Sequence, residues 1–592
     1  MTTASVVTVT QFSRRDTLEL TALHVDNQDY ENIVEWVIVE GSKSAEDCAA
    51  NEQRVKRLSC RVPIVYVPGD GTKHLGELRN ISNRNAKGDV IVVMDDDDWY
   101  PNTRVSHAVS TLVGSDALIA GCSAKRLYDY DLDVLIQFKS YGPNHSTNDC
   151  FAYKKEYLVD NSYDPSKDWA EETSFTKQFT NPMVQLDAKH TIIGSSHSTN
   201  TFNKKEICIL SCLLMNPSNP EQGFAYPMGF RSDENVREIM GPVYDRYFKA
   251  LVSCEKDQFD ISYFCGGTSA EWDPTNQALG GSEQAVVNLS EEWAKLGKRV
   301  AVYGKLTTEC EHNGVRYLSW KQFPFHKQHS VVILWRMSGV NCGLPFNIKT
   351  EKLFVDFHDN NFVFRHPYTP YVHKIDALFF KSQFHLDEYR KQFGDTPKCR
   401  VISNGIRLEE FEKSTDVQRD PYRFCYCSCY SRGLLELLMH VWPAIRAKEP
   451  RAELHVYYGI DSIADAQSKQ NLMFLMGQPG VMDHGRRPVD EIVREKQKST
   501  FHLYVTGSTG ETDCISIRES LVAGCIPLIS NSGVFKERDG LHFDLEKGYQ
   551  NVAEGTLELL GMPEFLEMAR QKLKTSKTIC SWKDVAEEWL KI

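Results

Sequence analysis

Short apolar runs rich in β-branched residues alternate with helix-like stretches along most of the chain, and this alternation constrains the fold more than any other feature. The first runs are SVVTVT, VEWVIVE, VPIVYV and DVIVVM. The next runs are ISYFCGG, RVAVYG, VVILW, KLFVDF and ALFF, and the last are YRFCYCS, AELHVYYG, TFHLYV and IPLIS. Strands that alternate with helices form largely parallel sheets with helices on their faces. The sequence therefore predicts an α/β fold.

The chain is long enough for several domains, because it has 592 residues and a compact domain usually takes about 150. We predict an α/β domain over residues 1–210, a linker and bridging helix over 211–260, and two Rossmann-like halves over 261–415 and 416–592. The linker assignment rests on the text LLMNPSNPEQGFAYPMGF, which is rich in Pro, Asn and Gly. Each predicted half has the size of a nucleotide-binding unit.

Charge and hydropathy exclude several classes of protein. The net charge is −12 and the Lys and Arg residues are scattered, which argues against a nucleic-acid partner. No apolar run approaches the roughly 18 to 20 residues of a membrane span, and the first residues lack the order of a signal peptide. We therefore expect a cytoplasmic protein, with contact at a membrane surface left open. Cys425, Cys427 and Cys429 alternate as residues on one face of a strand do, so we interpret them as buried thiols and not as a metal site.

Four consecutive aspartates, Asp95 to Asp98, directly follow the apolar run VIVVM. In open α/β sheets, ligands bind at the carboxyl ends of the strands. Carboxylates this close repel one another by about a kcal/mol or more per pair. A divalent cation, Mg²⁺ or Mn²⁺, removes this repulsion and usually completes its coordination with water and ligand phosphates. The cluster therefore predicts a metal and a nucleotide diphosphate, with a solvated acidic turn as the alternative.

The residues around this cluster resemble the donor site of family 2 glycosyltransferases, which have the GT-A fold. The matching text is GELRN from Gly76, then KGD before the strand, then DDDDWYP. The resemblance implies that Asp95 and Asp97 hold the metal and the nucleotide, and that Arg79 contacts the donor. Thr10, at the end of the first strand, and Glu40, at the end of the second, match the positions that hold the base and ribose. Glu40 stands where the family usually has Asp.

The same resemblance assigns two more residues. The segment DWAEETSF resembles the family's Glu-Asp-x-x-Phe segment and places Glu172 at the general base. An inverting transfer needs a carboxylate opposite the leaving diphosphate, to take the proton of the acceptor hydroxyl. His197 resembles a third metal ligand of related GT-A enzymes. A surface helix start for Glu171 and Glu172, and an ordinary polar role for His197, are the alternatives.

Glycines and two glutamates indicate a second site. Gly280 and Gly281 precede the amphipathic run QAVVNLSEEWAKLG, and the backbone N–H groups at a helix amino terminus favour phosphate. Glu511 and Glu519 have seven residues between them, so Glu511 is expected in the loop after the strand FHLYV and Glu519 in the next helix. Both can then face one ligand, one accepting hydrogen bonds from sugar hydroxyls and the other from a ribose.

Together these residues resemble family 4 glycosyltransferases of the GT-B fold, over residues 261–592. Further matches are FHD from Phe357, SQFH from Ser382, VISNG from Val401 and SRGL from Ser431. The resemblance implies a phosphate-binding Arg432, a His358 that meets the donor sugar, and retaining transfer without a metal. The family often has a second basic residue shortly before Arg432, where this chain has FCYCSCY. Either another cation, such as Arg486 or Arg487, neutralises the diphosphate, or this half is impaired.

We therefore predict a bifunctional glycosyltransferase that transfers sugars from nucleotide-sugar donors to a glycan or glycoconjugate. The amino-terminal domain is expected to be inverting and metal-dependent, and the carboxyl-terminal part retaining and metal-independent. The first alternative is that only one half is catalytic. The second is that the other half is a carbohydrate- or nucleotide-binding module. A nucleotidyltransferase is less favoured, because the first strand lacks the Gly-rich, Lys-containing start that grips a triphosphate.

Overall fold

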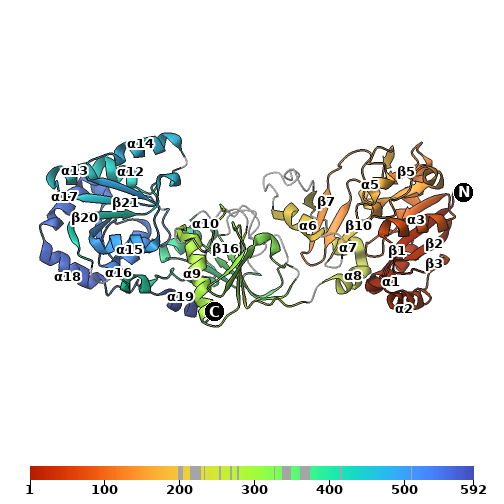
Figure 1. The fold of residues 1–592 in the computed structure, drawn as a ribbon, viewed down its shortest axis with the longest axis horizontal. Coiled ribbons are helices and arrows are strands. Elements are labelled where there is room, and N and C mark those ends of the chain that lie inside the picture. The colour runs from red at the N-terminus through yellow and green to blue at the C-terminus, as the bar shows by residue number, and fades with distance from the viewer. Residues whose placement is uncertain are drawn as a thin grey trace. The chain divides into compact units, whose positions relative to one another are not determined.

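The structure is a computed structural model of the whole chain. It describes all residues except 198–199, 201–203, 214–228, 233, 253–254, 267–269, 277–278, 326, 337–347, 361–373, 414–416, 464 and 509. Most of the predicted linker text therefore lies outside the described residues. The chain divides into two compact units (Figure 1). Unit 1 is Met1–Glu255 with Pro324–Lys327 and Gly343–Lys349, and unit 2 is Lys256–Phe323, Gln328–Cys342 and Thr350–Ile592.

A mixed sheet forms the centre of unit 1, with seven strands among the described residues in the order β3-β2-β1-β4-β8-β5-β9. Strand β8 runs antiparallel to β4 and β5, and the other neighbours are parallel. The strands are β1 (Ala4–Thr10), β2 (Ile33–Glu40), β3 (Ile64–Val67), β4 (Val90–Val93), β5 (Ile119–Gly121), β8 (Ala152–Lys154) and β9 (Met183–Gln185). The accompanying helices are α1 (Arg15–Asp26), α2 (Ala45–Val55), α3 (Leu75–Asn85), α4 (Arg104–Val113) and α5 (Glu172–Phe175).

A smaller sheet in unit 1 has the order β10-β6-β7-β11. Its strands are β6 (Arg126–Asp129), β7 (Val134–Phe138), β10 (Ile193–Ser196) and β11 (Gly229–Ser232), and the helices that follow β10 are α6 (Lys204–Leu213), α7 (Val236–Met240) and α8 (Tyr244–Leu251). Strand β11 pairs with β7, and Tyr244 and Tyr247 of α8 pack with Trp99 and Tyr130. Described residues that we expected in the linker and bridging helix thus lie in unit 1.

The first half of unit 2 contains a sheet in the order β14-β15-β13-β12-β16-β17-β18-β19, parallel except for β14. Its strands are β12 (Ile261–Gly266), β13 (Val300–Gly304), β14 (Cys310–His312), β15 (Val315–Ser319), β16 (His329–Trp335), β17 (Thr350–Asp356), β18 (Ala377–Phe380) and β19 (Cys399–Val401). The helices are α9 (Gly281–Lys295), α10 (Gln383–Phe393) and α11 (Leu408–Glu412). The last helix of the chain, α19 (Trp582–Trp589), returns to this half and stacks Trp589 on Phe379.

The second half of unit 2 contains a fully parallel sheet in the order β22-β21-β20-β23-β24-β25. Its strands are β20 (Asp420–Cys427), β21 (Glu453–Tyr457), β22 (Val481–Gly485), β23 (Ser499–Tyr504), β24 (Ile526–Ser530) and β25 (Leu541–Phe543). Its helices are α12 (Leu434–Glu436), α13 (Trp442–Lys448), α14 (Ala466–Met476), α15 (Val489–Lys498), α16 (Ile515–Ala523), α17 (Tyr549–Leu560) and α18 (Pro563–Leu573). Helices α12, α13 and α17 cover one face and α15 and α16 the other (Figure 1).

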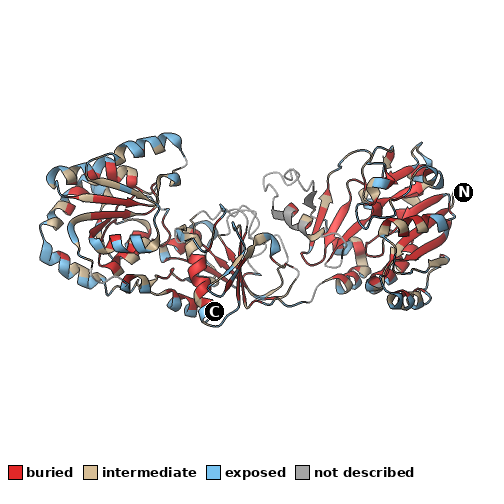
Figure 2. Cartoon of the chain, viewed as in Figure 1, coloured by how far each residue is buried: buried red, intermediate tan, exposed pale blue. Residues whose placement is uncertain are grey.

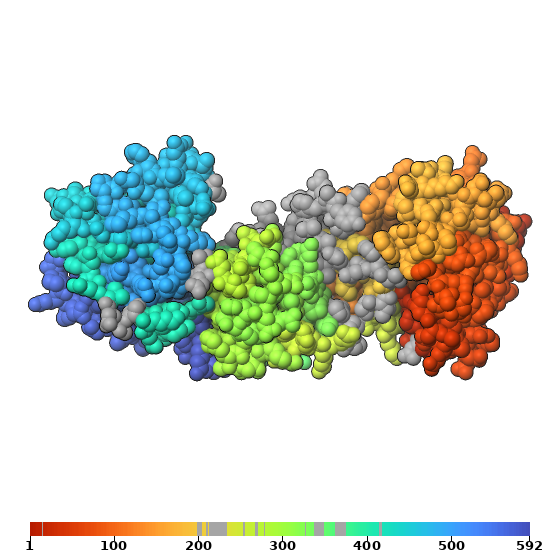
Figure 3. Space-filling model, in the orientation of Figure 1, coloured from red at the N-terminus to blue at the C-terminus, as the bar shows by residue number. Residues whose placement is uncertain are grey.

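In each sheet of unit 2 the first strand, β12 or β20, lies in the interior, and later strands are added on both sides of it. Nucleotide-binding Rossmann folds have the same strand arrangement. The predicted α/β fold class is thus confirmed. The inner strands of the sheets are largely buried, whereas edge strands such as β3 and β22 and the outer faces of the helices are more exposed (Figure 2). Side chains fill the space between the ribbons within residues 1–195, the red-to-orange region of Figure 3. Among the described residues, no helix is long and apolar enough to cross a membrane.

Candidate active sites

The aspartate cluster of unit 1 lies at the carboxyl end of β4, as predicted from the sequence. Strands β1 and β4 are parallel neighbours, so residues after β4 lie beside the end of β1. Thr10, the last residue of β1, donates a hydrogen bond from Oγ1 to Asp96 Oδ2 at 2.7 Å. Ser195 N–H, in β10, donates to Asp98 Oδ1 at 2.6 Å. Both Asp96 and Asp98 are therefore bound by protein groups at this edge of the sheet.

Asp97 is the member of the cluster around which other polar side chains gather. Its Oδ2 accepts hydrogen bonds from Arg14, which follows β1, and from Asn200 Nδ2 at 3.2 Å. His197 Nε2 lies 3.0 Å from the same oxygen. Burial opposes ionisation, but Arg14 holds the pKa of Asp97 well below its usual range. Burial also lowers the pKa of His197, which favours the neutral imidazole that a metal requires.

Arg79 joins two carboxylates of the site. Its two terminal nitrogens donate to the two oxygens of Asp95 at 3.0 and 3.2 Å, and Nε donates to Glu171 Oε1 at 2.9 Å. Burial opposes the charge on the guanidinium, but Asp95 and Glu171 raise the pKa of Arg79 well above its ordinary value. The sequence indicated Arg79 and Asp95 as donor-binding residues, but it did not indicate that they pair or that Glu171 joins them.

Glu172 differs from its neighbour Glu171. Glu171 is buried and ion-paired, whereas Glu172, the first residue of α5, is partly exposed, and among the described residues no side chain donates a hydrogen bond to its carboxylate. Burial and the nearby Glu171 raise the pKa of Glu172. A partly exposed carboxylate with a raised pKa suits a general base.

Glu40 lies at the end of β2 and is fully buried. Its Oε1 accepts from the backbone N–H of Ser42 at 2.8 Å, and its Oε2 accepts from Asn51 Nδ2 at 2.7 Å and from Tyr66 OH at 2.9 Å. Three donors therefore already bind this carboxylate. In this structure Glu40 organises the loop after β2, and a direct contact with a base would require these bonds to rearrange.

A divalent cation is the group that the family resemblance implies for unit 1. Among the described residues, no three or more His, Cys, Asp and Glu side chains converge as a ready metal site. Asp97 and His197 nevertheless offer one carboxylate and one neutral imidazole, 3.0 Å apart. Mg²⁺ commonly takes only one or two protein ligands and completes its coordination with substrate phosphates and water. The two side chains thus suit a cation that binds together with a diphosphate and displaces Arg14 and Asn200 from the same Asp97 oxygen. The carboxylate of Asp95 is held by Arg79.

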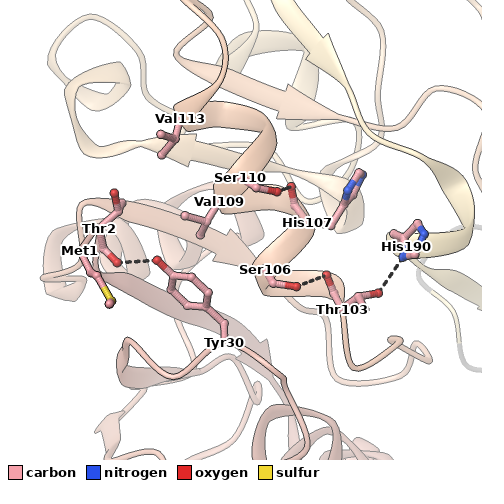
Figure 4. A pocket seen from close by; sticks show the side chains of 10 residues that line it. All are labelled: Met1, Thr2, Tyr30, Thr103, Ser106, His107, Val109, Ser110, Val113 and His190. Carbon is pink, nitrogen blue, oxygen red and sulfur yellow. Dashed lines mark hydrogen bonds between the residues drawn. The ribbon is translucent and has the colours of Figure 1, made fainter.

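A surface pocket of about 610 Å³ elsewhere in unit 1 contains none of the predicted site residues (Figure 4). Met1 and Thr2, which precede β1, line it, so it lies at the end of the strands away from the aspartates. Tyr30 OH donates to Thr2 O at 2.6 Å, and Thr103 Oγ1 lies 2.9 Å from His190 Nδ1. None of its lining residues is an Asp, Glu, Lys or Arg, so it lacks the charges that the predicted chemistry needs.

In unit 2 a single cavity of about 270 Å³ brings together predicted residues from both halves. It is lined by Gly280, Gly281, His358, Arg432, Glu511 and Glu519, among others. The two glycines lie at the amino terminus of α9, and Glu519 lies in α16. Residues that are more than 200 positions apart in the sequence thus face one space. Its size is near the lower end of the range for small-molecule sites.

Glu511 is held by three donors on one oxygen. Oε1 accepts from Arg432 at 2.6 Å, from Tyr504 OH at 2.6 Å and from Ser428 Oγ at 3.1 Å. Burial opposes the charge on the guanidinium of Arg432, but Glu511 raises its pKa. The other oxygen, Oε2, is the one that these bonds leave for a ligand. The structure therefore places the predicted sugar-binding acid and the predicted phosphate-binding cation in direct contact.

His358 is oriented by a buried carboxylate that the sequence did not indicate. His358 Nε2 lies 3.0 Å from Asp356 Oδ2, at the end of β17, and the ammonium group of Lys381 donates to Asp356 Oδ1. Burial lowers the pKa of His358. Thr512, next to Glu511, donates from Oγ1 to the backbone oxygen of His358 at 2.9 Å. The contact joins the two halves of unit 2 beside the cavity.

Glu519 also has an unforeseen partner. Lys496, in α15, is fully buried and donates from Nζ to Glu519 Oε2 at 2.5 Å and to Ser516 Oγ at 3.0 Å. Nothing in the spacing of Lys496 indicated this role, because α15 reads as an ordinary amphipathic helix. Arg486 and Arg487, which we considered as substitutes for the missing basic residue, both line the cavity.

Comparisons with known proteins bear directly on unit 1. Residues 5–164 match the model of glycosyl transferase family 2. The match covers the first four strands, the aspartate cluster and Arg79. Unit 1 therefore contains a family 2 glycosyltransferase domain, and the protein is a glycosyltransferase. No curated protein sequence matches the chain.

Several solved structures are similar to part of the chain. Sucrose-phosphate synthase from Thermosynechococcus elongatus is 13% identical, with a TM-score of 0.43, over 56% of this chain and 97% of its own. A glycosyltransferase from Rickettsia africae is 14% identical, with a TM-score of 0.43, over 57% of this chain and 98% of its own. Alr3699/HepE from Anabaena, solved with UDP and glucose, is 11% identical, with a TM-score of 0.42, over 56% of this chain and 99% of its own.

Proposed function

We propose that the protein carries two glycosyl-transfer sites, one in each unit, and uses nucleotide-sugar donors at both. Unit 1 would transfer with inversion and with a divalent cation, and unit 2 with retention and without a metal. The acceptor would be a glycan or a glycoconjugate. The observation that carries the proposal for unit 2 is the cavity lined by six predicted residues from both halves. For unit 1 it is the family match together with the polar groups around Asp97.

In unit 1, Glu172 is proposed as the general base. The acceptor hydroxyl gives its proton to the carboxylate of Glu172, its oxygen forms a bond to the anomeric carbon, and the bond to the diphosphate oxygen breaks with its electron pair leaving on the diphosphate. Its partial exposure and raised pKa support this role. Asp97 and His197 would hold the divalent cation, which neutralises diphosphate charge when it is bound.

In unit 2, charge on the leaving diphosphate would be stabilised by protein groups. The amino terminus of α9, with Gly280 and Gly281, offers backbone N–H groups, and Arg432 offers a guanidinium. Glu511 and His358 would bind the sugar, because both line the cavity and both are held in place by neighbouring groups. Glu519, braced by Lys496, would accept hydrogen bonds from the ribose.

A second candidate, in which unit 2 binds a nucleotide or carbohydrate without turnover, is favoured by one contact. Arg432 is engaged by Glu511, so its charge is already neutralised, and the text before it, FCYCSCY, contains no second cation. A pocket with too little positive charge would still bind a nucleoside but would stabilise a leaving diphosphate poorly.

A panel of nucleotide sugars, assayed on the full chain with Mn²⁺ or with EDTA, tests the proposal. Two activities are expected, of which one is abolished by EDTA and inverts the anomeric configuration, and the other survives EDTA and retains it. An inverting activity alone, with nucleotide still binding in EDTA, would favour the binding module. Two activities with the same stereochemistry would contradict the assignment of the two mechanisms.

A further inference from the structure

Arg336 is a cation in the cavity of unit 2 that the sequence motifs did not indicate. It directly follows β16, on the first half of the unit, and lines the same cavity as Arg432 of the second half. Its side chain is 27% exposed, so the guanidinium is held largely within the protein while remaining open to the cavity. This half therefore contributes a guanidinium to the cavity, which is paired with Glu283 and Asp359 before a ligand binds.

Several contacts fix the position of this guanidinium at the amino terminus of α9. One terminal nitrogen donates to Ser282 Oγ at 2.7 Å and the other to Glu283 Oε1 at 3.3 Å, both in the first turn of the helix. Nε lies 2.9 Å from Asp359 Oδ2. The guanidinium also lies over the ring of Trp335, 4.5 Å from its centre. The charge is thus placed where the backbone N–H groups of Gly281 and its neighbours already favour an anion.

The backbone at Arg336 has the left-handed conformation, with a φ of 46°. A residue with a long side chain rarely adopts this conformation, and such strain persists where the surroundings impose it and gathers at ligand sites. Here the N–H of Arg336 donates to the carbonyl of Asp356 at 3.0 Å, at the end of the neighbouring strand. The turn that directs Arg336 to α9 is therefore built into the strand ends.

The other cations of the cavity are placed differently. Arg486 lies over the ring of Tyr458, 4.7 Å from its centre, and Arg487 donates from Nε to the carbonyl of His484 at 2.9 Å. Both contacts are within the second half, at the ends of β21 and β22. Arg336 is the cation whose described contacts reach the phosphate-favouring terminus of α9 directly.

We propose that Arg336 binds the diphosphate of the nucleotide-sugar donor in unit 2 and supplies the positive charge that the sequence lacks before Arg432. This inference rests on the proposed donor site of unit 2. On binding, the guanidinium exchanges contacts with Glu283 and Asp359 for paired hydrogen bonds to phosphate oxygens, a geometry that Arg forms well. As the acceptor oxygen bonds to the anomeric carbon, the bond from that carbon to the diphosphate oxygen breaks with its electron pair leaving on the diphosphate, which takes the proton of the acceptor hydroxyl. Arg336 stabilises the charge that develops on the diphosphate and transfers no proton itself.

Nucleotide binding to the full chain tests this role. Titration calorimetry would measure the affinity of the chain for UDP, GDP and ADP in turn, in EDTA and in the Asp97→Ala background. The nucleoside of the diphosphate that binds most tightly would then be measured in the same way. We expect Arg336→Gln to weaken diphosphate binding by about 10-fold or more while nucleoside affinity is unchanged, since a charge-assisted hydrogen bond contributes about 1.5 to 3 kcal/mol. Arg299→Gln is the matched control, because Arg299 lies on the same half and is 66% exposed.

A second variant gives the opposite sign. Asp359→Asn removes a carboxylate that competes for the guanidinium, and Asp359 is 42% exposed, so we expect it to fold and to bind the diphosphate a few-fold more tightly. Unchanged diphosphate affinity in both variants would overturn the role of Arg336 and leave the donor site standing. Equal losses of nucleoside and diphosphate affinity in Arg336→Gln would also overturn it. Absence of any nucleotide binding in the parent protein would overturn the donor site itself.

Discussion

Arg79 and Asp95 form a two-point ion pair, with hydrogen bonds of 3.0 and 3.2 Å between the guanidinium and the two carboxylate oxygens. Arg79 is only 8% exposed, and its remaining nitrogen binds Glu171. One buried cation thus compensates two acids, Asp95 and Glu171. The arrangement makes Arg79 a structural requirement of unit 1 as well as a candidate donor ligand.

Replacement of Arg79 by Met should therefore destabilise unit 1. Removing one partner of a buried ion pair leaves an uncompensated charge and typically costs about 3 to 5 kcal/mol. Scanning calorimetry of the full chain should show a lower transition temperature for one unit only. Arg84→Met is the control on the same helix, since Arg84 is 59% exposed in its pair with Glu77 and such surface pairs contribute about 1 kcal/mol or less. Equal effects of the two substitutions would refute the account.

Glu172 should determine the acid side of the pH profile of the metal-dependent activity. A general base must be ionised, so activity is lost as the pH falls through its pKa. Because burial and Glu171 raise that pKa, the loss should occur above the ordinary Glu value of 4.5. Glu172→Gln should lower kcat by about 10²- to 10⁴-fold and remove this loss of activity at low pH. Glu172→Asp should keep the loss at low pH, at a reduced rate. An unchanged profile in Glu172→Gln would assign the base elsewhere.

Lys496 should position Glu519 in unit 2. Lys496→Met leaves the carboxylate of Glu519 without its ammonium partner, so we expect the donor KM of the metal-independent activity to rise about 10-fold or more with a smaller change in kcat. Lys498→Met is the control, because Lys498 is an exposed residue of the same helix. A fall in kcat with no change in KM would show that Glu519 does not act in donor binding.

The strands and the position of the aspartate cluster could be predicted from the sequence because both depend on residues that are close together in the chain. The apolar runs predict strands, and the position of Asp95 to Asp98 after one run places them at a sheet edge. Counter-charges are different, because they depend on which distant segments meet. Arg14 reaches Asp97 across 83 positions, and Lys381 reaches Asp356 across 25. The residues that neighbour Arg14 or Lys381 in the sequence do not indicate which carboxylate either side chain will contact.

Glu40 is a residue whose position was predicted from the sequence but whose hydrogen-bond partners were not. The sequence identified an acid at the end of the second strand, and the structure has it there, fully buried. Whether such an acid faces a ligand depends on the donors around it, and Asn51 and Tyr66 come from other elements. A family resemblance predicts where a residue lies in the fold. Whether its side chain can contact a ligand depends on the hydrogen bonds that it makes with neighbouring elements.

We propose that two independent donor sites act in one chain. The most direct test is the initial rate of each activity in two variants of the full chain, Asp97→Ala and Glu511→Ala. We predict that Asp97→Ala abolishes only the metal-dependent activity and that Glu511→Ala abolishes only the metal-independent one. Survival of both activities in either variant, or loss of both in either, would contradict the account.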